Sequence, residues 1–263
     1  MVPLDDGNGH MPVGDLPHTM PATLNVRPPH VALAIAAHPD DVDFGCGATL
    51  AKWAAGGCHL HVLVLTDGSK GSWDPAQDLA GLIDTRHREQ RDALACLGGG
   101  VVEFLDAPDG ELEAGLLERR RVCEVIRRVQ PEVVLGHDPW RRYRLHPDHR
   151  NAGWLTTDAI VAARDPHFFA DMGIEPHRPR ALMLWEADEP NHVEDTTGYL
   201  DTKLAAITAH RSQHLSTLGI EPGTEAFTAG IASFRRRLKA QMAEHGALVG
   251  LGSGEAFRLI EGI

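Results

Sequence analysis

The sequence lacks the features that identify several large classes of protein. None of its apolar runs approaches the roughly 18–20 residues that a membrane-spanning helix needs. The first 29 residues also lack the apolar segment of a signal peptide. Basic residues number 25 against 37 acidic ones, so the charge balance does not favour a nucleic-acid-binding surface. These absences predict a cytoplasmic protein that has no membrane span and binds no nucleic acid.

Two short motifs are missing as well. The four cysteines form no C-x-x-C pair, which excludes a zinc ribbon and a thioredoxin-like redox motif. We expect each of them to be a small buried hydrophobic residue or a free thiol: Cys46, Cys58, Cys96 and Cys123. No G-x-G-x-x-G sequence follows the first predicted strand, where Gly45-Cys46-Gly47 alone is a weak signal. A dinucleotide-binding module is therefore disfavoured.

The first 29 residues differ in composition from the rest of the 263-residue chain. They contain six prolines and three glycines. A segment of this composition cannot bury enough apolar surface to offset the entropy lost when it becomes ordered. We therefore predict a flexible N-terminal arm over residues 1–29, followed by a single domain over residues 30–263.

From residue 31 onward, short apolar runs alternate with longer amphipathic stretches, the pattern of repeated βα units around a mostly parallel sheet. The predicted strands are 31–37, 59–65, 101–105, 132–136 and 181–185. The predicted helices are 45–55, 82–97, 116–129, about 149–163, 199–212 and 228–244. Prolines make residues 164–180 an irregular excursion. The predicted fold class is therefore α/β.

Polar side chains follow four of the predicted strands. The clusters are 38–41 after the first strand, 66–71 after the second, Asp106 with Asp109 after the third, and 137–149 after the fourth. In open parallel sheets, ligands bind at the carboxyl ends of the strands. Such loops are often polar, so one cluster alone would mean little. Four clusters on the same edge predict a binding or catalytic site.

Two of these clusters, 38–41 and 146–149, combine carboxylates with imidazoles and could together hold a metal ion. A catalytic zinc ion takes three ligands from imidazole nitrogen and carboxylate oxygen and keeps one position open. His38 and Asp41 are three residues apart in a turn, and His149 can supply the third ligand from the neighbouring loop. The alternative for either cluster alone is structural, with its aspartates capping the helices that follow. The two clusters together favour one Zn²⁺ per chain, or another divalent ion.

Proton transfer needs residues that do not bind the ion. A bound ion lowers the pKa of its water toward ~7, and a nearby carboxylate that is not a ligand can remove the water's proton. Asp40, adjacent to Asp41 but directed elsewhere by the tight turn, is the candidate general base. His146 is the candidate acid, because an imidazolium could stabilise a tetrahedral oxyanion and protonate a leaving amine. Asp148 could orient one of the imidazoles.

These motifs resemble those of the PIG-L/LmbE family of zinc-dependent N-acetylglucosamine de-N-acetylases, over about residues 31–215. The resemblance rests on Ala37-His38-Pro39-Asp40-Asp41 followed by Gly45, on Thr66-Asp67-Gly68 with Gly71, and on His146-Pro147-Asp148-His149. Further matches are Arg86 and Glu89 before Leu97-Gly98, Pro108-Asp109-Gly110-Glu111-Leu112, and Lys203 with His210-Arg211-Ser212-Gln213. The family's three zinc ligands fall on His38, Asp41 and His149, and its base falls on Asp40.

The resemblance implies a Rossmann-like three-layer α/β sandwich and an enzyme that removes acetyl or other acyl groups from amino sugars. The expected partner is a small amino-sugar substrate. Members of the family are often multimeric, so a homo-oligomer is a further expectation. Arg86, Asp109 and Arg144 are the expected substrate contacts. Relatives that act on mycothiol precursors have a tyrosine at the position of Arg144, and many members have glutamate at the position of Val42, so the identity of the sugar stays open.

Three functions are compatible with these residues. The leading prediction is zinc-dependent removal of an N-acetyl group from an N-acetylglucosamine-containing small molecule or glycoconjugate. The same site could serve an amidase that acts on a thiol-sugar conjugate. The third alternative is a non-catalytic, Rossmann-like module that binds a sugar or a nucleotide, which the missing G-x-G-x-x-G sequence disfavours.

Overall fold

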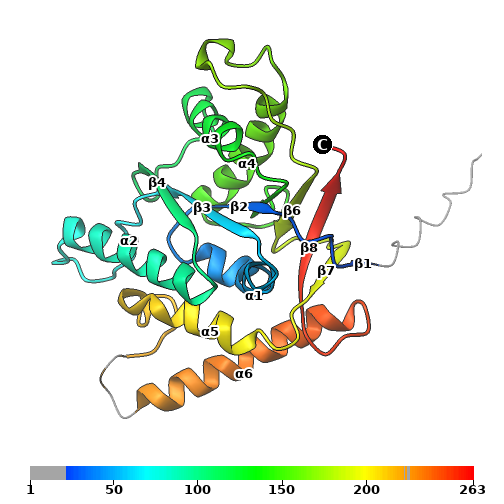
Figure 1. Cartoon of the computed structure of the whole chain (residues 1–263). Helices are drawn as coiled ribbons and strands as arrows, with labels where there is room; N and C mark the ends of the chain where they lie inside the picture. Colours follow the sequence, from blue (N-terminus) through cyan, green and yellow to red (C-terminus); the bar gives the residue numbers. More distant parts are fainter. Residues whose placement is uncertain (1–21, 222, 224–225) are drawn as a thin grey trace, which may run out of the picture.

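The computed structural model describes residues 22–221, 223 and 226–263, which form a three-layer α/β sandwich around an eight-stranded sheet (Figure 1). The strands lie in the order β1-β7-β8-β6-β5-β2-β3-β4. Their bounds are β1 Thr23–Leu24, β2 Val31–Ala36, β3 His59–Thr66, β4 Val101–Ala107, β5 Val133–His137, β6 Ala181–Trp185, β7 His192–Asp195 and β8 Gly254–Glu261. Neighbouring strands are parallel, except that β8 runs antiparallel to β6 and β7. The predicted mostly parallel α/β sheet is confirmed.

The strand order reverses between β2 and β5. Strands β3 and β4 follow β2 on one side, whereas β5 and β6 lie on the other. β2 and β5 pair in parallel, with Leu33 opposite Val134 and Ile35 opposite Gly136. In doubly wound sheets, such a reversal opens a crevice at the carboxyl ends of the two strands. The two clusters that combine acids and imidazoles follow β2 and β5, so the fold brings them to this crevice.

Both faces of the sheet are covered, which explains why β2 is apolar along its whole length. Its alanines, Ala32, Ala34 and Ala36, belong to the hydrophobic core on one face. Leu33 and Ile35 belong to the core on the other face. Successive side chains of a strand point to opposite faces, so a strand between two cores needs apolar residues at every position.

Helices α3 and α4 cover one face of the sheet, and α1, α2, α5 and α6 lie on the other side (Figure 1). The bounds are α1 Asp41–Ala55, α2 Leu79–Cys96, α3 Leu116–Val129, α4 Pro147–Arg164, α5 Leu200–Ala209 and α6 Ala226–Ala247, with short 3-10 helices η1 Ala170–Met172 and η2 Arg211–Gln213. Leu238 and Met242 of α6 share a small core with Ile207 of α5. In the described part of the chain, no helix combines the length and apolar character needed to cross a membrane.

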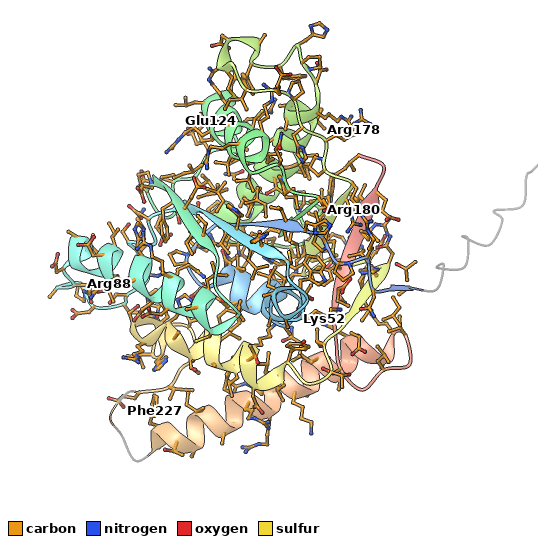
Figure 2. The ribbon with its side chains drawn as sticks, viewed as in Figure 1. Lys52, Arg88, Glu124, Arg178, Arg180 and Phe227 are labelled. Carbon is orange, nitrogen blue, oxygen red and sulfur yellow. The ribbon has the colours of Figure 1, made fainter. Side chains whose placement is uncertain are left out.

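Charged side chains lie on the outer surfaces of the helices and along the edge of the sheet. Arg88 on α2 and Glu124 on α3 are exposed (Figure 2). Lys52, at the end of α1, forms an ion pair with the buried carboxylate of Glu194 on β7. This pair ties the helix layer to the strands at the β1 end of the sheet.

All five predicted strands and all six predicted helices are present near their predicted positions. The prediction missed β1, β7 and β8, and β8 closes the chain where only helices were predicted. Helix α1 begins at Asp41, before the predicted start at residue 45, and its backbone is non-helical at Cys46. Residues 164–180 are irregular as predicted, apart from η1.

The N-terminal segment differs in part from the predicted arm. Residues 1–21 lie outside the described residues, so the prediction is not tested there. For residues 22–29 the structure corrects it: Thr23 pairs with His192, and the backbone N–H of Val26 donates to Glu194 Oε1 at 2.8 Å. Val26 is buried in the same core as α1. The composition is rich in proline and glycine, but the edge of the sheet supplies the backbone partners that order this stretch.

Candidate active site and metal centre

A cavity of about 670 Å³ opens where the carboxyl ends of β2 and β5 meet. Seven of the predicted site residues line it: His38, Asp40, Asp41, Arg86, Asp109, His146 and His149. Asp148 is fully buried behind the wall, and Arg144 is not among the lining residues. The fold therefore brings residues that are more than a hundred positions apart in the sequence into one cavity.

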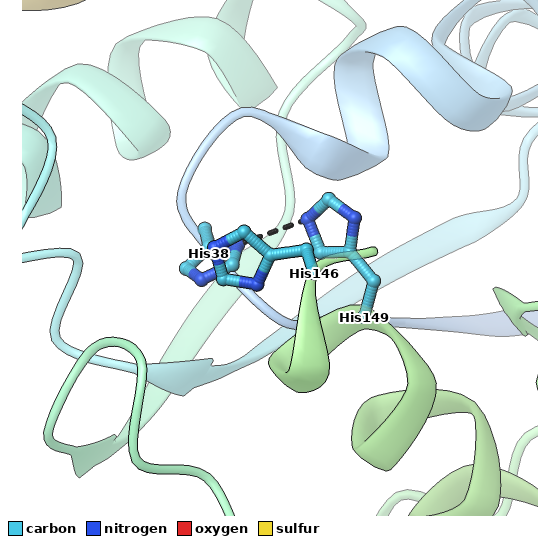
Figure 3. Close-up of side chains that lie close together, drawn as sticks. All are labelled: His38, His146 and His149. Atoms are coloured by element: carbon cyan, nitrogen blue, oxygen red, sulfur yellow. Dashed lines mark hydrogen bonds between the residues drawn. The ribbon is translucent and has the colours of Figure 1, made fainter. Parts of the chain in front are cut away.

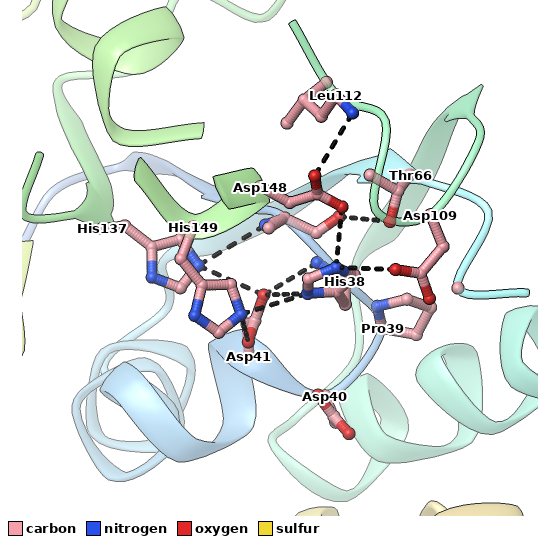
Figure 4. Close-up of polar contacts among 12 residues, drawn as sticks. His38, Pro39, Asp40, Asp41, Thr66, Asp109, Leu112, His137, Asp148 and His149 are labelled. Carbon is pink, nitrogen blue, oxygen red and sulfur yellow. Dashed lines mark hydrogen bonds and ion pairs between the residues drawn. The ribbon is translucent and has the colours of Figure 1, made fainter. Parts of the chain in front are cut away.

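The three predicted metal ligands converge in this cavity (Figure 4). The Nδ1 atom of His38 lies 3.1 Å from Nε2 of His149 and 3.5 Å from Oδ2 of Asp41. Nε2 of His149 lies 3.2 Å from Oδ1 of Asp41. Ligand atoms about 2.0–2.2 Å from a tetrahedral ion lie about 3.3–3.6 Å from one another, which is close to the observed spacing.

Carboxylates orient the ring of His38 from its far side. Its Nε2 atom lies 3.1 Å from Oδ2 of Asp148 and 3.2 Å from Oδ1 of Asp109. The Asp148 carboxylate is itself fixed, because it accepts two backbone N–H groups from the loop after β4. An ionised carboxylate only accepts hydrogen bonds, so Nε2 of His38 carries a proton and the lone pair of Nδ1 faces the other two ligands. Asp148 thus contacts an imidazole, as the sequence predicts.

The cluster attracts positive charge. Burial lowers the pKa of His38, but hydrogen bonds with three surrounding carboxylates outweigh burial and raise the pKa well above its usual value. Burial raises the pKa of Asp41, yet His149 and His137 hold that pKa well below its usual value. Lone pairs that face one another repel unless a proton or a metal ion lies between them. Two imidazoles and a carboxylate are donors that zinc accepts, so these residues fit the metal that the resemblance implies.

Asp40 and Asp41 are adjacent, yet the backbone turns their side chains apart (Figure 4). Asp40 has a φ of 102°, in the left-handed region that strains residues other than glycine. Two hydrogen bonds hold the turn: Asp40 N donates to Gln90 Oε1 at 2.7 Å, and Asp40 O accepts from Asp43 N at 2.9 Å. Burial raises the pKa of Asp40 from 3.8 to about 6, although the Arg86 guanidinium opposes the shift. Environments that separate the pKa values of two neighbouring carboxylates are typical of acid–base sites.

Arg86 of α2 binds the backbone behind Asp40. Its Nη2 atom donates to Pro39 O and its Nη1 atom to Gly68 O, each at 2.7 Å. The same guanidinium lies 3.6 Å from Oδ2 of Asp40 and 3.9 Å from Oδ2 of Asp109. A Cβ atom at Gly68 would lie 2.9 Å from Nη1, which explains why the loop after β3 has glycine there. Because both terminal nitrogens bind main-chain carbonyls, Arg86 fixes the turn that carries the candidate base.

His146 lies beside the ligand imidazoles at the N-cap position of α4 (Figure 3). Its ring centroid lies 4.7 Å from that of His38 and 4.8 Å from that of His149. Burial and these two neighbouring imidazoles lower the pKa of His146. A lowered pKa favours the neutral ring, and the role of His146 as an acid stays a prediction.

His137, the last residue of β5, is a site residue that was not among the predicted ones. Its Nε2 atom lies 3.1 Å from Oδ2 of Asp41, and its ring stacks on that of His149 at a centroid distance of 4.6 Å. The available signal was its position at the start of the polar cluster that follows the fourth predicted strand. A histidine at the end of a buried strand is also a common core residue, so that signal was weak.

Arg144, a predicted substrate contact, lies behind the cavity wall. Its side chain is 8% exposed and binds the carboxylate of Glu186, which follows β6. Its Nη2 atom lies 2.9 Å from Nδ1 of His137. This arrangement does not support a direct contact between Arg144 and a substrate, whereas Arg86 and Asp109 do reach the cavity.

Within the described residues, three overlapping groups have ligand atoms close enough to share one ion. They are His38 with His146 and His149, Asp41 with His137 and His149, and His38 with Asp109 and Asp148. The predicted set takes one or two members from each group and includes both histidines whose ring nitrogens lie 3.1 Å apart. The geometry thus allows alternative ligands, and the hydrogen-bond partners of each ring decide between them.

Comparison with known proteins gives the same family as the motifs. Residues 33–160 match the family model of PIG-L, described as GlcNAc-PI de-N-acetylase. Over 184 residues the chain is 36% identical to the diacetylchitobiose deacetylase of Thermococcus kodakarensis, and the alignment covers 69% of each protein. It is also 28% identical over 244 residues to the 4-oxalmesaconate hydratase of Pseudomonas putida, covering 86% of this chain and 92% of that protein.

A solved structure supports the relationship. The N,N'-diacetylchitobiose deacetylase from Pyrococcus horikoshii superposes with a TM-score of 0.79 and 28% sequence identity, covering 89% of this chain and 85% of that one. The likeness therefore extends beyond the matched family segment to nearly the whole described fold. From its motifs, its fold and these relatives, the chain belongs to the PIG-L family of deacetylases.

Proposed function

We propose that the protein is a zinc-dependent hydrolase that removes an N-acetyl or other N-acyl group from an N-acetylglucosamine-containing small molecule or glycoconjugate. One observation carries the proposal: His38, Asp41 and His149 converge beside the buried carboxylate of Asp40 in a single cavity. The substrate class is supported by the names of two relatives, a diacetylchitobiose deacetylase and a deacetylase of an inositol-linked acetamido sugar.

His38, Asp41 and His149 would hold the ion. When bound, zinc supplies a Lewis acid that polarises an acyl carbonyl and lowers the pKa of water to about 7. Another divalent ion that accepts imidazole and carboxylate would serve the same purpose. The chain contributes a fixed donor set, because Asp148 and Asp109 orient His38 and the tight turn orients Asp41.

Asp40 moves the proton. As the oxygen of water bonds to the acyl carbon, a carboxylate oxygen of Asp40 accepts a proton from that water. The same proton is then available to the nitrogen when the carbon–nitrogen bond breaks. A carboxyl group with a pKa of about 6 can both accept and release a proton near neutral pH. Gln90 and Arg86 keep this side chain in place by binding the turn that carries it.

His146 and two further residues complete the proposed site. A neutral His146 can donate an N–H hydrogen bond to the oxyanion that forms at the acyl carbon. Arg86 and Asp109 line the cavity and would contact sugar hydroxyls, each of which needs a donor or acceptor when buried. Arg144 acts instead on His137 and Glu186.

A second candidate is the addition of water to an unsaturated carboxylic acid. It is favoured by the sequence similarity to the 4-oxalmesaconate hydratase, whose alignment covers 86% of this chain, against 69% for the diacetylchitobiose deacetylase of Thermococcus kodakarensis. The cavity wall also carries Lys70, Arg86 and Arg141, whose positive charges would attract a carboxylate. Each of these charges already faces an acidic partner, however: Lys70 lies 2.9 Å from Glu111, Arg141 lies 3.1 Å from Glu186, and Arg86 lies 3.6 Å from Asp40.

A substrate panel separates these candidates. The purified protein, loaded with zinc, is incubated with N-acetylglucosaminides, with thiol-sugar conjugates and with unsaturated dicarboxylic acids. Amine release and loss of the conjugated double bond are then followed in parallel. The proposal predicts amine release from N-acetylglucosaminides, abolished by a chelator and restored by zinc.

Amine release from thiol-sugar conjugates alone would favour the amidase, and loss of the double bond without amine release would favour the hydratase. A protein that binds sugar without releasing amine would be a non-catalytic module.

A further inference from the structure

His137 faces two groups that can only donate hydrogen bonds. The indole Nε1–H of Trp185 donates to Nδ1 of His137 at 3.1 Å, and Nη2 of Arg144 lies 2.9 Å from the same atom. Neither an indole N–H nor a guanidinium can accept a hydrogen bond. Nδ1 of His137 must therefore be the acceptor, without a proton. The only proton of the neutral ring is then on Nε2.

The Nε2–H group has one short partner. It lies 3.1 Å from Oδ2 of Asp41, within normal hydrogen-bond range. The backbone N–H of Ala37 is also directed at Nε2 of His137 and would favour an unprotonated Nε2, but at 3.5 Å this contact is longer than a normal hydrogen bond and weaker than the one with Asp41. Glu186, which could favour a proton on Nδ1, is 3.9 Å away and is bound by Arg144 and Arg141. The surroundings therefore fix which nitrogen carries the proton.

The fixed proton determines how Asp41 presents its two oxygens. Oδ2 accepts from the backbone N–H of His38 at 2.7 Å and from Nε2–H of His137. Oδ1 lies 3.2 Å from Nε2 of His149, the nitrogen that is 3.1 Å from Nδ1 of His38. Oδ2 also lies 3.5 Å from Nδ1 of His38, but it already accepts from two donors, so Oδ1 is the oxygen better placed to bind a cation.

We propose that His137, held in its Nε2–H tautomer by Arg144 and Trp185, is a positioning residue that turns Oδ1 of Asp41 toward the metal, and that it is not itself a ligand. A metal on Nε2 of His137 would need that nitrogen's lone pair, and the proton would have to move to Nδ1, where two donors already point. The tautomer stands on hydrogen-bond geometry alone, whereas its effect on the metal rests on the proposed function.

The tautomer can be observed directly. Nuclear magnetic resonance of protein labelled with ¹⁵N-histidine distinguishes protonated from unprotonated ring nitrogens, and the spectrum of His137→Gln assigns the signals of His137. The proposal predicts a protonated Nε2 and an unprotonated Nδ1, both in the chelator-treated protein and after zinc is added. A protonated Nδ1, or zinc bound to Nε2, would overturn it. Because the chelator-treated spectrum needs no metal and no substrate, this result is independent of whether the proposed function holds.

Zinc affinity tests the consequence for Asp41. His137→Ala should weaken zinc binding about 10–100-fold, the usual effect of removing a group that orients a ligand. His137→Gln should recover most of that loss, because its amide N–H can replace Nε2–H. Equal affinities for wild type and His137→Ala, or no recovery with glutamine, would contradict the proposal. If wild type bound no zinc, the proposed function would fail and the tautomer measurement alone would decide the inference.

The chain offers a matched control for the indole. Trp53 is as fully buried as Trp185, and its Nε1–H has no hydrogen-bond partner among the described residues. Trp185→Phe and Trp53→Phe therefore remove similar buried volume, but only the first removes a donor to His137. We expect a several-fold weaker zinc affinity for Trp185→Phe and no change for Trp53→Phe. Equal effects of the two substitutions would show that packing, and not the hydrogen bond, is responsible.

Discussion

Replacing Lys203 by methionine should destabilise the protein by about 3–4 kcal/mol, because it breaks a buried ion pair at the kink of α1. Lys203 of α5 is 3% exposed and its partner, Glu255 of β8, is 2% exposed. Lys203 Nζ also donates to Phe44 O at 2.7 Å, just before the non-helical residue Cys46. The pair therefore supports the short first segment of α1, which carries Asp41.

The magnitude follows from what is left unpaired. Removing one member of a buried pair costs about 3–5 kcal/mol, and losing the hydrogen bond from Lys203 to the Phe44 carbonyl adds about 1–3 kcal/mol. Two hydrogen bonds reduce the loss, since Glu255 still accepts from Ala48 N at 3.1 Å and from Thr49 N at 2.7 Å. These bonds cap the second segment of α1 and stabilise the charge that remains on Glu255. The net loss of stability is therefore expected at about 3–4 kcal/mol.

Urea unfolding followed by circular dichroism, at one fixed zinc concentration, measures this loss. The control is Arg235→Met, which breaks an exposed pair with Asp201 between α6 and α5 and should leave the free energy of unfolding nearly unchanged. A double-mutant cycle of Lys203→Met with Glu255→Gln should show strong coupling. A loss no larger than that of Arg235→Met, or simple additivity in the cycle, would refute the reasoning.

Three further predictions concern the edge of the sheet, the loop after β3 and the metal. Burial raises the pKa of Glu194. A hydrogen bond with His192 and the charge of Lys52 lower this pKa by more than burial raises it, so the net pKa is below its usual value. The stability that Glu194 contributes is therefore present above its unfolded pKa and is lost as the pH falls through the lower folded pKa. In urea unfolding, Glu194→Gln should be less stable than wild type at pH 7. The difference between the two proteins should shrink below about pH 4.5. Gly71→Ala should lower the turnover number, because its Cβ would lie 2.5 Å from Arg86 Nη1, whereas Gly252→Ala, with open space around its Cβ, should not; equal turnover in the two variants would contradict this. Zinc at 1,000 times its dissociation constant should stabilise wild type by about 4 kcal/mol in thermal melts, and Asp41→Asn should lose most of that shift; an unchanged shift would remove Asp41 from the ligand set.

The layout of the central sheet could be predicted from the sequence because its strands are unambiguous. Residues 31–36 are apolar throughout, since β2 lies between two cores, and the next helix ends at Gly56-Gly57. Strand β8 could not be found in this way. Its sequence, GEAFRLIE, mixes Glu255 and Arg258 with apolar residues, and the first of these is buried as a helix cap and ion-pair partner. A buried charge breaks the expected alternation of a strand, and only tertiary contacts reveal why it is tolerated.

In the candidate site, too, some residues could be predicted from the sequence, whereas the roles of others depend on tertiary contacts. His38, Asp41 and His149 could be chosen from the sequence because the two clusters follow strands whose carboxyl ends meet. The role of Arg144 could not be predicted, since its partners, Glu186 and His137, follow or end other strands and their positions depend on the register of β5 with β6. Sequence spacing identifies which residues reach the cavity edge, but it does not determine which way a long side chain points.

The central claim is that the two adjacent aspartates have different roles: Asp41 binds the metal, and Asp40 is the general base that accepts the proton. Its most direct test measures zinc content and amine release from an N-acetylglucosaminide together, for wild type, Asp40→Asn and Asp41→Asn. We predict that Asp40→Asn keeps one zinc ion per chain and loses about 10²–10⁴-fold in turnover, the usual contribution of a general base. Asp41→Asn should lose both the metal and the activity. An Asp40→Asn protein that retains the full rate, or that loses zinc as Asp41→Asn does, would contradict the account.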